Sequence, residues 1–433
     1  MKYVNGLHEA KLLLDTRERV VSATESHDAM LSAEATVREI IQAVRTDGDN
    51  AVNLYTQTFD KVDLPSIEVE KETIDDAYAT SPKSLIDSLL IASERVRTFH
   101  ERSMPKSWHD ESNGYGEKFG PVKTAGIYIP GGSAAYPSSV LMTAIPARVA
   151  GVSEIVVCTP ANGTRGPDPS VLAACRICGV DRVFAVGGAQ AIAGMAYGTE
   201  TIPRVDLICG PGNRYVTLAK KMVYGDVGVD GLYGPTETIV IAEDTADPRH
   251  CAADLLAQAE HDVLATPILI ATSENLIRSV EEQLKIQLNQ LSRSSIAEAS
   301  LNNNGLLIRV NSVAEAIEIS NEFAPEHLCL LVNNPESYLP IVKNAGAVFL
   351  GHGTPEVLGD FVAGPSHVMP TGGTAKFSSP LGVHQFLKVT STVAFSPSLL
   401  QELQEATSII AKHEGFTGHA KAIEVRITEN PDS

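Results

Sequence analysis

Short apolar runs, glycine-rich turns and amphipathic stretches follow one another in a fixed order along the middle of the chain. Near residue 124 the run TAGIYI precedes a Pro-Gly-Gly turn, and an apolar stretch with helical spacing comes next. The same order occurs four times, over 124–151, 154–179, 181–198 and 205–225. A strand, a turn and a helix in regular repetition are typical of a parallel sheet with right-handed crossovers.

A second series of strands and helices begins at residue 236. Its candidate strands, separated by helical patterns, are the ranges 236–244, 267–273, 305–310, 328–332 and 347–351. The helix that follows Ser312 opens with a capping box, in which Glu315 stands three residues after the N-cap serine. The pattern therefore predicts two parallel α/β sheets, one after the other in the chain.

The segments outside these series show helical periodicity but no sheet of their own. Residues 25–121 contain amphipathic stretches, of which ATVREIIQAVRTDG is the clearest, and Gly48 supplies a stop signal. This block must pack on one of the two sheets, and we expect it on the second. Residues 1–24 are polar and mildly helical, and the tail from residue 383 returns to helical spacing, with a short strand candidate at 419–427.

Residues 351–382 interrupt the alternation with a long stretch rich in glycine and proline. A loop of this length inside a compact domain is usually functional or disordered. Asp360, His367 and Lys376 lie within it, so it is a candidate for carrying chemistry.

Composition and charge narrow the class of function. Of 433 residues, 43% are hydrophobic and 20% are charged, which is a globular composition, and the formal net charge of −19 argues against nucleic-acid or membrane-surface partners. No apolar run reaches the length of a membrane span, and residues 1–20 contain no short apolar h-region, so we expect no secretory signal. Six cysteines in so long a chain do not indicate a disulfide framework, and the Cys175–Cys178 pair is interpreted as core packing. We expect a reduced, cytoplasmic protein.

A polar stripe runs beside the apolar positions of the helix DLLAQAEHD. Asp254, Gln258 and His261 are spaced so that they share one side of that helix. Alone, such a stripe is either the solvated side of a surface helix or a metal or substrate site. Further oxygen and nitrogen donors that would suit zinc or manganese, although distant in sequence, are Asp360, Glu414 and His419.

Two further groups of residues stand at positions that favour chemistry. The turns that end the strands of the first sheet contain Tyr128, Gly187–Gln190 and Gly210–Asn213, at the edge where open parallel sheets bind ligands. None of these turns spells G-x-G-x-x-G, and ordinary turn chemistry is the alternative. In FAPEHL, Glu326 and His327 are adjacent between a helix and a strand, where they would either divide two proton transfers or form a plain surface turn.

Eight sequence blocks, in their order, make the chain resemble the histidinol dehydrogenase family. The blocks are IYIPGGSAAYPSSVLMTAIPARVAGV, GGAQAIAGMAYGTE, GPGNRYV, GPTET, DLLAQAEHD, FAPEHL, GDFVAGPSHVMPT and HAKAIEVR. The resemblance covers residues 25–426. It implies oxidation of L-histidinol to L-histidine, the last step of histidine biosynthesis, in two NAD-dependent hydride transfers through a retained aldehyde.

The resemblance also implies roles for single residues. His327 would be the general base for the alcohol proton, and Glu326 would activate the water that attacks the aldehyde. The ligands of one zinc ion per subunit, which would position the substrate, would be Gln258, His261, Asp360 and His419. The substrate would be contacted by these ligands, by His327, and by Thr236, His367 and Glu414. The contacts to NAD would be Tyr128, Gln190 and Asn213.

For the fold, the resemblance implies an intertwined homodimer with two incomplete Rossmann-like parallel-sheet domains and small N- and C-terminal extensions. The expected parts are a helical extension at 1–24, a discontinuous α/β domain at 25–127 and 238–381, an NAD-binding domain at 128–237 and a dimerisation tail at 382–433. His419 and Glu414 of one subunit would act in the active site of the other. No nucleic-acid or membrane partner is expected.

One departure from the family concerns Thr236 in GPTET, where many members have serine. The hydroxyl is kept, so we expect the change to be tolerated, but some relatives that oxidise other small alcohols, such as a sulfonated propanediol, carry the threonine. Alternatives from other classes are a zinc hydrolase with Glu326 as its base, and a metal-binding or nucleotide-sensing protein without activity. A requirement for NAD separates the dehydrogenase from the hydrolase.

Overall fold

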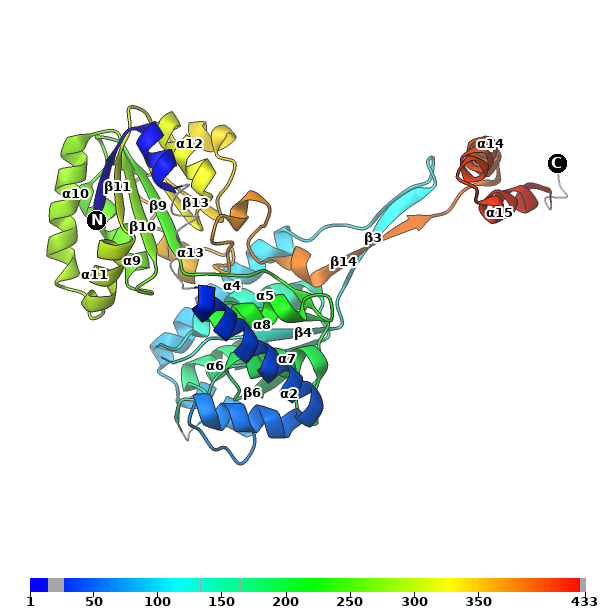
Figure 1. The fold of residues 1–433 in the computed structure, drawn as a ribbon, viewed down its shortest axis with the longest axis horizontal. Helices are drawn as coiled ribbons and strands as arrows, with labels where there is room; N and C mark the ends of the chain where they lie inside the picture. The colour runs from blue at the N-terminus through cyan, green and yellow to red at the C-terminus, as the bar shows by residue number, and fades with distance from the viewer. Residues whose placement is uncertain (15–26, 133, 164–165, 429–433) are drawn as a thin grey trace. The chain divides into compact units, whose positions relative to one another are not determined.

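The computed structural model describes residues 1–14, 27–132, 134–163 and 166–428. Contacts between residues divide the chain into two units, with unit 1 made of Met1–Ser103 and Val122–Phe386, and unit 2 of Met104–Pro121 and Leu387–Ser433. Unit 1 contains two parallel sheets with their helices, and unit 2 contains a small antiparallel sheet and two helices (Figure 1). The chain is thus a mixed α/β protein with parallel sheets, as predicted.

The first sheet of unit 1 has five parallel strands in the order β6-β5-β4-β7-β8. The strands are β4 (Thr124–Tyr128), β5 (Glu154–Cys158), β6 (Arg182–Phe184), β7 (Leu207–Cys209) and β8 (Gly228–Val229). The helices between them are α5 (Pro137–Ala150), α6 (Pro169–Cys178), α7 (Gly188–Tyr197) and α8 (Arg214–Val223). The four predicted repeats of strand, turn and helix are therefore confirmed, and the cysteines of α6 are buried free thiols.

The second sheet has six parallel strands in the order β1-β11-β10-β9-β12-β13. The strands are β1 (Lys2–Asn5), β9 (Glu237–Ala242), β10 (Thr266–Ala271), β11 (Leu306–Arg309), β12 (His327–Leu331) and β13 (Ala347–Leu350). Apolar residues of α9 (Pro248–Ala259), α10 (Glu274–Leu288) and α11 (Ser294–Asn303) form the core on one face, and α12 (Val313–Phe323) covers the other (Figure 1). The predicted capping box is confirmed in one of its two bonds, because the Glu315 N–H donates to the Ser312 hydroxyl at 3.2 Å, whereas the Glu315 carboxylate accepts the N–H of Asn311 instead of that of Ser312.

The N-terminal segment departs from the expected helical extension. Residues 2–5 form the edge strand β1, which pairs with β11 and buries Val4 in the core of the six-stranded sheet. A helix follows at 7–14, and the rest of the predicted extension, 15–24, lies outside the described residues. The strand was not predicted because four residues are too few to show a periodicity, and because β1 forms only by pairing with β11, which is distant in sequence.

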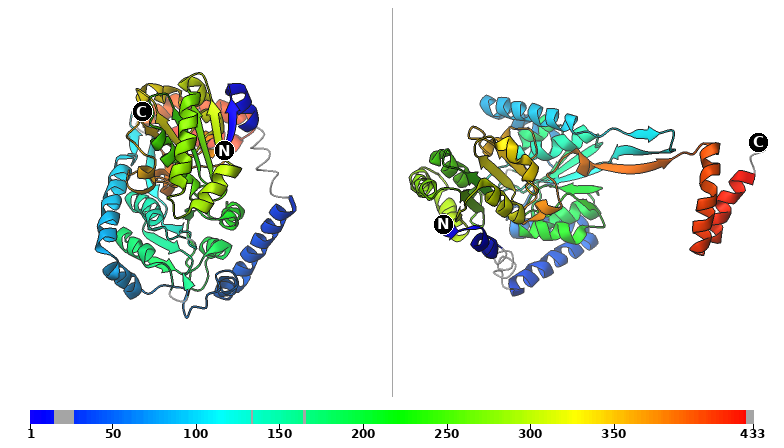
Figure 2. Two further views of the ribbon diagram at one scale, coloured as in Figure 1. Left: turned by 90° about the vertical axis from the view of Figure 1, so that its left-hand side faces the viewer. Right: turned by 90° about the horizontal axis from the view of Figure 1, so that it is seen from above.

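The helical block packs on the five-stranded sheet, which corrects our expectation that it packs on the second. It consists of α2 (His27–Phe59), which Gly48 interrupts with a φ of 53°, α3 (Lys71–Thr80) and α4 (Lys83–Arg102). Val37, Ile40 and Val44 of α2 join the core formed with α7, while α4 packs on α5 (Figure 2, left). The physical reason is that α7 is buried on all sides, so it needs a second layer of apolar side chains outside it.

Unit 2 is built from segments far apart in the sequence. Its antiparallel sheet contains β2 (Trp108–Asp110), β3 (Tyr115–Pro121) and β14 (Leu387–Val393), and its helices are α14 (Pro397–His413) and α15 (Thr417–Thr428). The strand predicted at 419–427 is wrong, because this segment is the helix α15. The two helices pack on each other, with the Ser408 hydroxyl donating to Glu424 at 2.9 Å and Lys412 pairing with the same carboxylate at 2.7 Å.

The glycine- and proline-rich stretch of 351–382 is ordered by short helical turns, α13 (Val357–Phe361) and η3 (Thr374–Lys376). Two other short 3-10 helices are η2 (Pro335–Ile341) and η4 (Val383–Phe386). Within the described part of the chain, no helix is long and apolar enough to cross a membrane.

The packing of α2 on α7 yields a stability prediction. Replacing Ile40, which is 2% exposed, with alanine leaves a cavity in this contact and should lower the free energy of unfolding by about 2–5 kcal/mol. Urea denaturation measures the change. On the same helix Leu54 is 59% exposed, so Leu54→Ala is the matched control and should change stability by less than about 0.5 kcal/mol. Equal effects of the two substitutions would contradict the observed orientation of α2.

Candidate active site

The predicted catalytic residues lie where two neighbouring strands of the six-stranded sheet begin. The parallel register of β9 and β12 pairs Thr238 with His327. Thr236 stands just before β9 and Glu326 just before β12, so the register brings their side chains together, and the Thr236 hydroxyl lies 2.6 Å from Glu326 Oε2. The cluster is thus at the amino edge of this sheet, although parallel sheets usually bind ligands at the carboxyl edge.

A short link between α12 and β12 fixes the orientation of Glu326 and His327. α12 ends at Ala324, whose backbone adopts a left-handed φ of 58° and whose N–H donates to the Ser320 carbonyl. Pro325 then restricts the chain before β12 begins two residues later. Glu326 is 8% exposed and His327 is 2% exposed, so the alternative of a plain surface turn is wrong.

Glu326 is a buried carboxylic acid within a chain of hydrogen bonds. Burial raises its pKa, because the charged form loses hydration. Its Oε2 accepts the Glu237 N–H at 3.2 Å, and the Thr236 hydroxyl next to it also lies 2.8 Å from Gln258 Oε1. A hydroxyl donates one proton at a time, so in the protonated state Glu326 can donate to Thr236 while Thr236 donates to Gln258.

His327 lies between two carboxylates. Its Nε2 is 3.2 Å from Asp360 Oδ1, and its Nδ1 is 3.7 Å from Glu326 Oε2. Burial alone would lower its pKa, but the charge of Glu326 and the hydrogen bond to Asp360 outweigh burial and raise the pKa to about 10. The ring stacks on Phe349, with centroids 5.9 Å apart. The surroundings therefore stabilise the imidazolium in the metal-free protein, and a cation beside Asp360 would have to lower this pKa before the ring could accept a proton.

Three of the predicted metal ligands belong to unit 1, and two of them are in contact. Gln258 Nε2 donates to Asp360 Oδ2 at 3.0 Å, which joins the last turn of α9 to α13. His261 lies two residues beyond the end of α9, in a turn and not on the helix as predicted, and it is exposed. Desolvation still lowers the pKa of its imidazole. In the parts of the chain that the structure describes, no three side chains from His, Cys, Asp and Glu are arranged to hold a metal ion.

The polar residues of the segment DLLAQAEHD therefore lie in two different places. Gln258 and His261 lie with the cluster, whereas Asp254, one turn earlier, lines a separate hollow of about 220 Å³ with His250 and His352. Burial raises the pKa of Asp254 to about 6. The explanation as a solvated helix face is wrong for Gln258, which is 1% exposed.

Sequence reasoning missed Glu356, which lies behind His327. It is fully buried, and its Oε2 accepts from the Thr238 hydroxyl at 2.7 Å and from the Cys329 thiol at 3.1 Å. Burial raises its pKa to about 7. A signal was available, because Glu356 and Asp360 are four residues apart, the spacing at which side chains share one side of a helix.

His367 links the cluster to the helices of the other sheet. Its Nδ1 lies 2.7 Å from the Asp360 carbonyl oxygen, and its Nε2 lies 3.0 Å from the Ser139 hydroxyl on α5. Burial lowers its pKa, which favours the neutral ring. Ser139 was also missed, because a serine in the first turn of an apolar helix carries no distinctive pattern.

The remaining substrate and metal candidates, Glu414 and His419, belong to unit 2. Glu414 is the residue that follows α14, and His419 is on α15 with its ring beside that of Phe416, at 5.2 Å between centroids. Both side chains are exposed. The unit 1 cluster thus consists of Thr236, Gln258, His261, Glu326, His327, Asp360 and His367.

The predicted cofactor contacts lie at the carboxyl edge of the five-stranded sheet, where the strand order reverses between β4 and β7. The Tyr128 hydroxyl accepts the Gly188 N–H at 3.1 Å, and Asn213 caps α8 by accepting the N–H of Tyr215 at 3.0 Å. Gln190 is 1% exposed, yet neither atom of its amide has a hydrogen-bond partner among the described residues. A buried amide without partners is costly, so this position favours a bound polar group.

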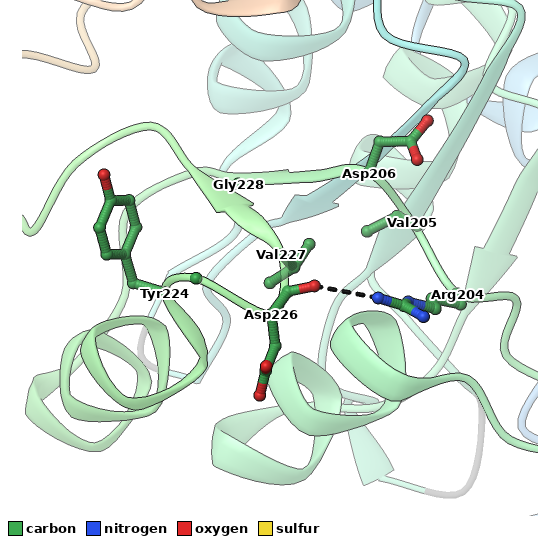
Figure 3. Close-up of a pocket in the computed structure, with 8 residues that line it drawn as sticks. Arg204, Val205, Asp206, Tyr224, Asp226, Val227 and Gly228 are labelled. Atoms are coloured by element: carbon green, nitrogen blue, oxygen red, sulfur yellow. Dashed lines mark hydrogen bonds between the residues drawn. The ribbon is translucent and has the colours of Figure 1, made fainter. Parts of the chain in front are cut away.

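A larger hollow, of about 720 Å³, lies at the amino ends of β7 and β8 (Figure 3). Arg204 and Tyr224 stand at its sides, and the guanidinium of Arg204 donates to the Asp226 carbonyl at 3.0 Å. It is at the opposite edge of the sheet from Tyr128 and Asn213, so it is separate from the predicted cofactor contacts.

Comparisons with known proteins agree with the resemblance found in the sequence. The family model described as histidinol dehydrogenase matches residues 23–427. A histidinol dehydrogenase of Sulfurimonas denitrificans is 47% identical over 91% of this chain and 93% of its own length, and one of Synechococcus sp. is 45% identical over 98% of each chain. The crystal structure of histidinol dehydrogenase from Elizabethkingia anophelis superposes with a TM-score of 0.88 at 36% identity, covering 91% of this chain and 92% of that one.

The carboxylates around His327 lead to a prediction about its ionisation. The substitution Glu326→Gln removes the charge that contributes most to raising this pKa, so the pKa of His327 should fall from about 10 toward its ordinary value near 6.5. A pH titration of the histidine side chains by NMR, in metal-free protein, measures the change. His100 is the internal control, because burial alone lowers its pKa to about 4, and this value should not move. An unchanged His327 pKa would refute this electrostatic account.

Proposed function

The chain belongs to the histidinol dehydrogenase family of oxidoreductases, and we propose that it oxidises L-histidinol to L-histidine in two steps that each transfer a hydride to NAD⁺. The observation that carries this proposal is the buried pair Glu326–His327, held beside Thr236 and Asp360 at the amino edge of the six-stranded sheet. Two adjacent groups that can each accept a proton match two oxidations that differ in what is deprotonated.

His327 is the proposed base of the first oxidation. The carbinol carbon releases hydride readily only when its oxygen begins to carry negative charge, so the alcohol proton must leave as the hydride leaves. The imidazole accepts that proton, and Glu326 and Asp360 stabilise the imidazolium that results. The aldehyde formed in this way is retained in the site for the second oxidation.

Glu326 is the proposed base of the second oxidation. An aldehyde has to add water before it can lose another hydride, and a carboxylate with a raised pKa is a stronger base for that water. Thr236 and the Glu237 N–H fix the direction of the carboxylate. The Thr236 hydroxyl makes these contacts as a serine hydroxyl could, so the threonine is compatible with histidinol as the substrate.

The donors present in unit 1 fit a zinc ion. Gln258, His261 and Asp360 would hold it, and His419 of unit 2, from the partner subunit, would complete one site per subunit. Gln258 meets Asp360 through its amide nitrogen at 3.0 Å, so the amide would have to turn for its oxygen to ligate the ion. Of the four proposed ligands, His261 and Asp360 are the two His, Asp or Glu side chains in unit 1, and His419 belongs to unit 2. Bound zinc would hold the imidazole and amine of the substrate and so orient it.

NAD is proposed to lie at the carboxyl edge of the five-stranded sheet, with contacts to Tyr128, Gln190 and Asn213. The unpartnered amide of Gln190 supports this position. The absence of G-x-G-x-x-G in the sequence fits a cofactor that is held by side chains and by loop backbone rather than by the usual glycine-rich turn.

We further propose an intertwined homodimer, in which unit 2 of one subunit supplies Glu414 and His419 to the partner's active site, where Glu414 and His367 line the substrate pocket. The exposed apolar side chains of unit 2 support an interface there, because association would remove them from water. They include Val393, Phe395, Ile409, Ile410 and Phe416. A cytoplasmic location stays a prediction.

The reaction itself is tested by its stoichiometry. Each histidinol consumed should yield two NADH and free histidine, since the aldehyde is retained between the oxidations. NADH absorbance and amino-acid analysis measure both products. Product formation without NAD would instead indicate hydrolytic chemistry, and one NADH with released aldehyde would contradict the two-base scheme.

Variants separate the two steps in the same assay. His327→Asn should slow histidinol oxidation by about 10²–10⁴-fold, and Glu326→Gln should slow oxidation of supplied histidinaldehyde more than that of histidinol. If both variants lost the same activity in both steps, the assignment of His327 to the first oxidation and Glu326 to the second would be refuted.

The shared site is tested by mixing inactive subunits. His261→Asn and His419→Asn dimers, after subunit exchange, should form mixed dimers with one doubly damaged and one intact site, so activity should return to about half per mixed dimer. The control mixture combines His261→Asn with Gln258→Ala, both in unit 1, and should stay inactive because each site keeps one lesion. Mixed dimers of the first kind that remain inactive would show that His419 acts within its own chain.

A further inference from the structure

A buried ion pair stands behind the loop that follows β7. Lys220 on α8 and Asp230, just after β8, are 2.6 Å apart, with side chains 2% and 0% exposed. The Lys220 ammonium also lies over the ring of Tyr233, 4.8 Å from its centroid. Neither residue was singled out by the sequence, and neither is used in the proposed chemistry.

The pair binds both backbone groups of one residue. The Gly210 N–H donates to Asp230 Oδ2 at 2.8 Å, and the Gly210 carbonyl accepts from Lys220 Nζ at 2.8 Å. On its other side Gly210 has no space, because a Cβ there would lie 2.1 Å from the Tyr128 carbonyl oxygen, and its φ is 109°. Gly210 is therefore fixed between the ion pair and Tyr128.

Gly210 begins the loop that leads to Asn213, and Tyr128 ends the neighbouring strand β4. Two of the three proposed NAD contacts thus depend on where Gly210 is held. Asp230 also accepts the Gly231 N–H at 2.7 Å, and the Thr217 hydroxyl donates to the Tyr233 carbonyl at 3.0 Å. The same cluster thereby fixes the first part of the segment that continues to Thr236.

A buried ion pair is an inefficient way to gain stability, because the cost of removing two charges from water offsets most of their attraction, and apolar residues of similar volume often serve as well. Directional hydrogen bonds are what apolar residues cannot supply. We propose that Lys220 and Asp230 are positioning residues, which hold the Gly210–Asn213 loop in its cofactor-binding conformation before the cofactor binds. This inference rests on the proposed use of NAD.

The test compares two neutral replacements of the pair. In Lys220→Met/Asp230→Asn the Gly210 carbonyl loses its donor, whereas in Lys220→Gln/Asp230→Asn a side-chain N–H donor is kept. Titration calorimetry with NADH should give a Kd raised about tenfold or more for the methionine variant and within about threefold of wild type for the glutamine variant. The KM for histidinol should change much less than the KM for NAD.

The matched control is the exposed ion pair between Arg176 and Asp75, which lies outside the site, and Arg176→Met/Asp75→Asn should bind NADH like wild type. A folded Lys220→Met/Asp230→Asn protein with wild-type NADH affinity would overturn the proposal. So would equal losses of affinity in both neutral variants, since these would follow the loss of charge and not of the hydrogen bond. Wild-type protein that fails to bind NADH would overturn the proposed function itself.

If the methionine variant does not fold, the wild-type protein still provides the test. Because Asp230 accepts the Gly210 N–H, hydrogen exchange of the peptide that contains residues 210–213 should be slow at Gly210 without any cofactor. Fast exchange there that slows only when NADH is added would show that the cofactor orders the loop, and the proposal would fail.

Discussion

The parallel register between β9 and β12 is the constraint on which the active-site geometry depends. It places Thr238 opposite His327, so that the residues just before the two strands meet. Thr236 reaches Glu326 at 2.6 Å for this reason, and Gln258 joins them from α9 at 2.8 Å. A shift of register by one residue would turn every side chain of β12 to the other face of the sheet and separate these groups.

Burial and pairing set the ionisation of these side chains. Glu326, His327, Glu356 and Asp360 are each less than one-tenth exposed, and buried charges are tolerated only when they are paired or hydrogen-bonded. The carboxylates outnumber the imidazole of His327, which explains why its pKa rises to about 10 while burial raises the pKa of Glu326 and Glu356. The proposed zinc ion would add a positive charge beside Asp360 and so offset part of this excess of carboxylates.

The sequence predicted what depends on local periodicity and missed what depends on distant partners. The repeats of strand, turn and helix, and the burial of Cys175 and Cys178, follow from spacing within a few residues. The packing of α2 could not be read in this way, because its apolar stripe fits either sheet and only the all-round burial of α7 decides. The segment 419–427 was misassigned because its short apolar pattern suits a strand as well as a helix, and contact with α14 selects the helix.

The candidate site shows the same limit. Motifs indicated Glu326, His327 and Gln258, whereas Glu356 and the Lys220–Asp230 pair escaped notice, because isolated charged residues in a sequence look like surface residues until the fold buries them. Glu356 is buried against Thr238 of β9 and Cys329 of β12, strands that are more than eighty residues apart in the chain. Lys220 and Asp230 are buried behind Gly210 in the other sheet of unit 1.

The segment from Asp230 to Thr236 connects the proposed cofactor site, at the carboxyl edge of one sheet, with the candidate active site, at the amino edge of the other. Asp230 is fixed at the carboxyl edge of the five-stranded sheet through Gly210, and six residues later Thr236 stands at the amino edge of the six-stranded sheet beside Glu326. Between them, the Gly234 N–H donates to Thr371 at 2.6 Å, and Ser139 meets His367 at 3.0 Å, so the loop of 351–382 contacts both halves of unit 1. A hydride acceptor proposed at the first edge and a base at the second need to meet over one carbon atom. The short covalent link between the two edges limits how far apart they can move, and this explains why an amino-edge site, unusual for a parallel sheet, is workable in this protein.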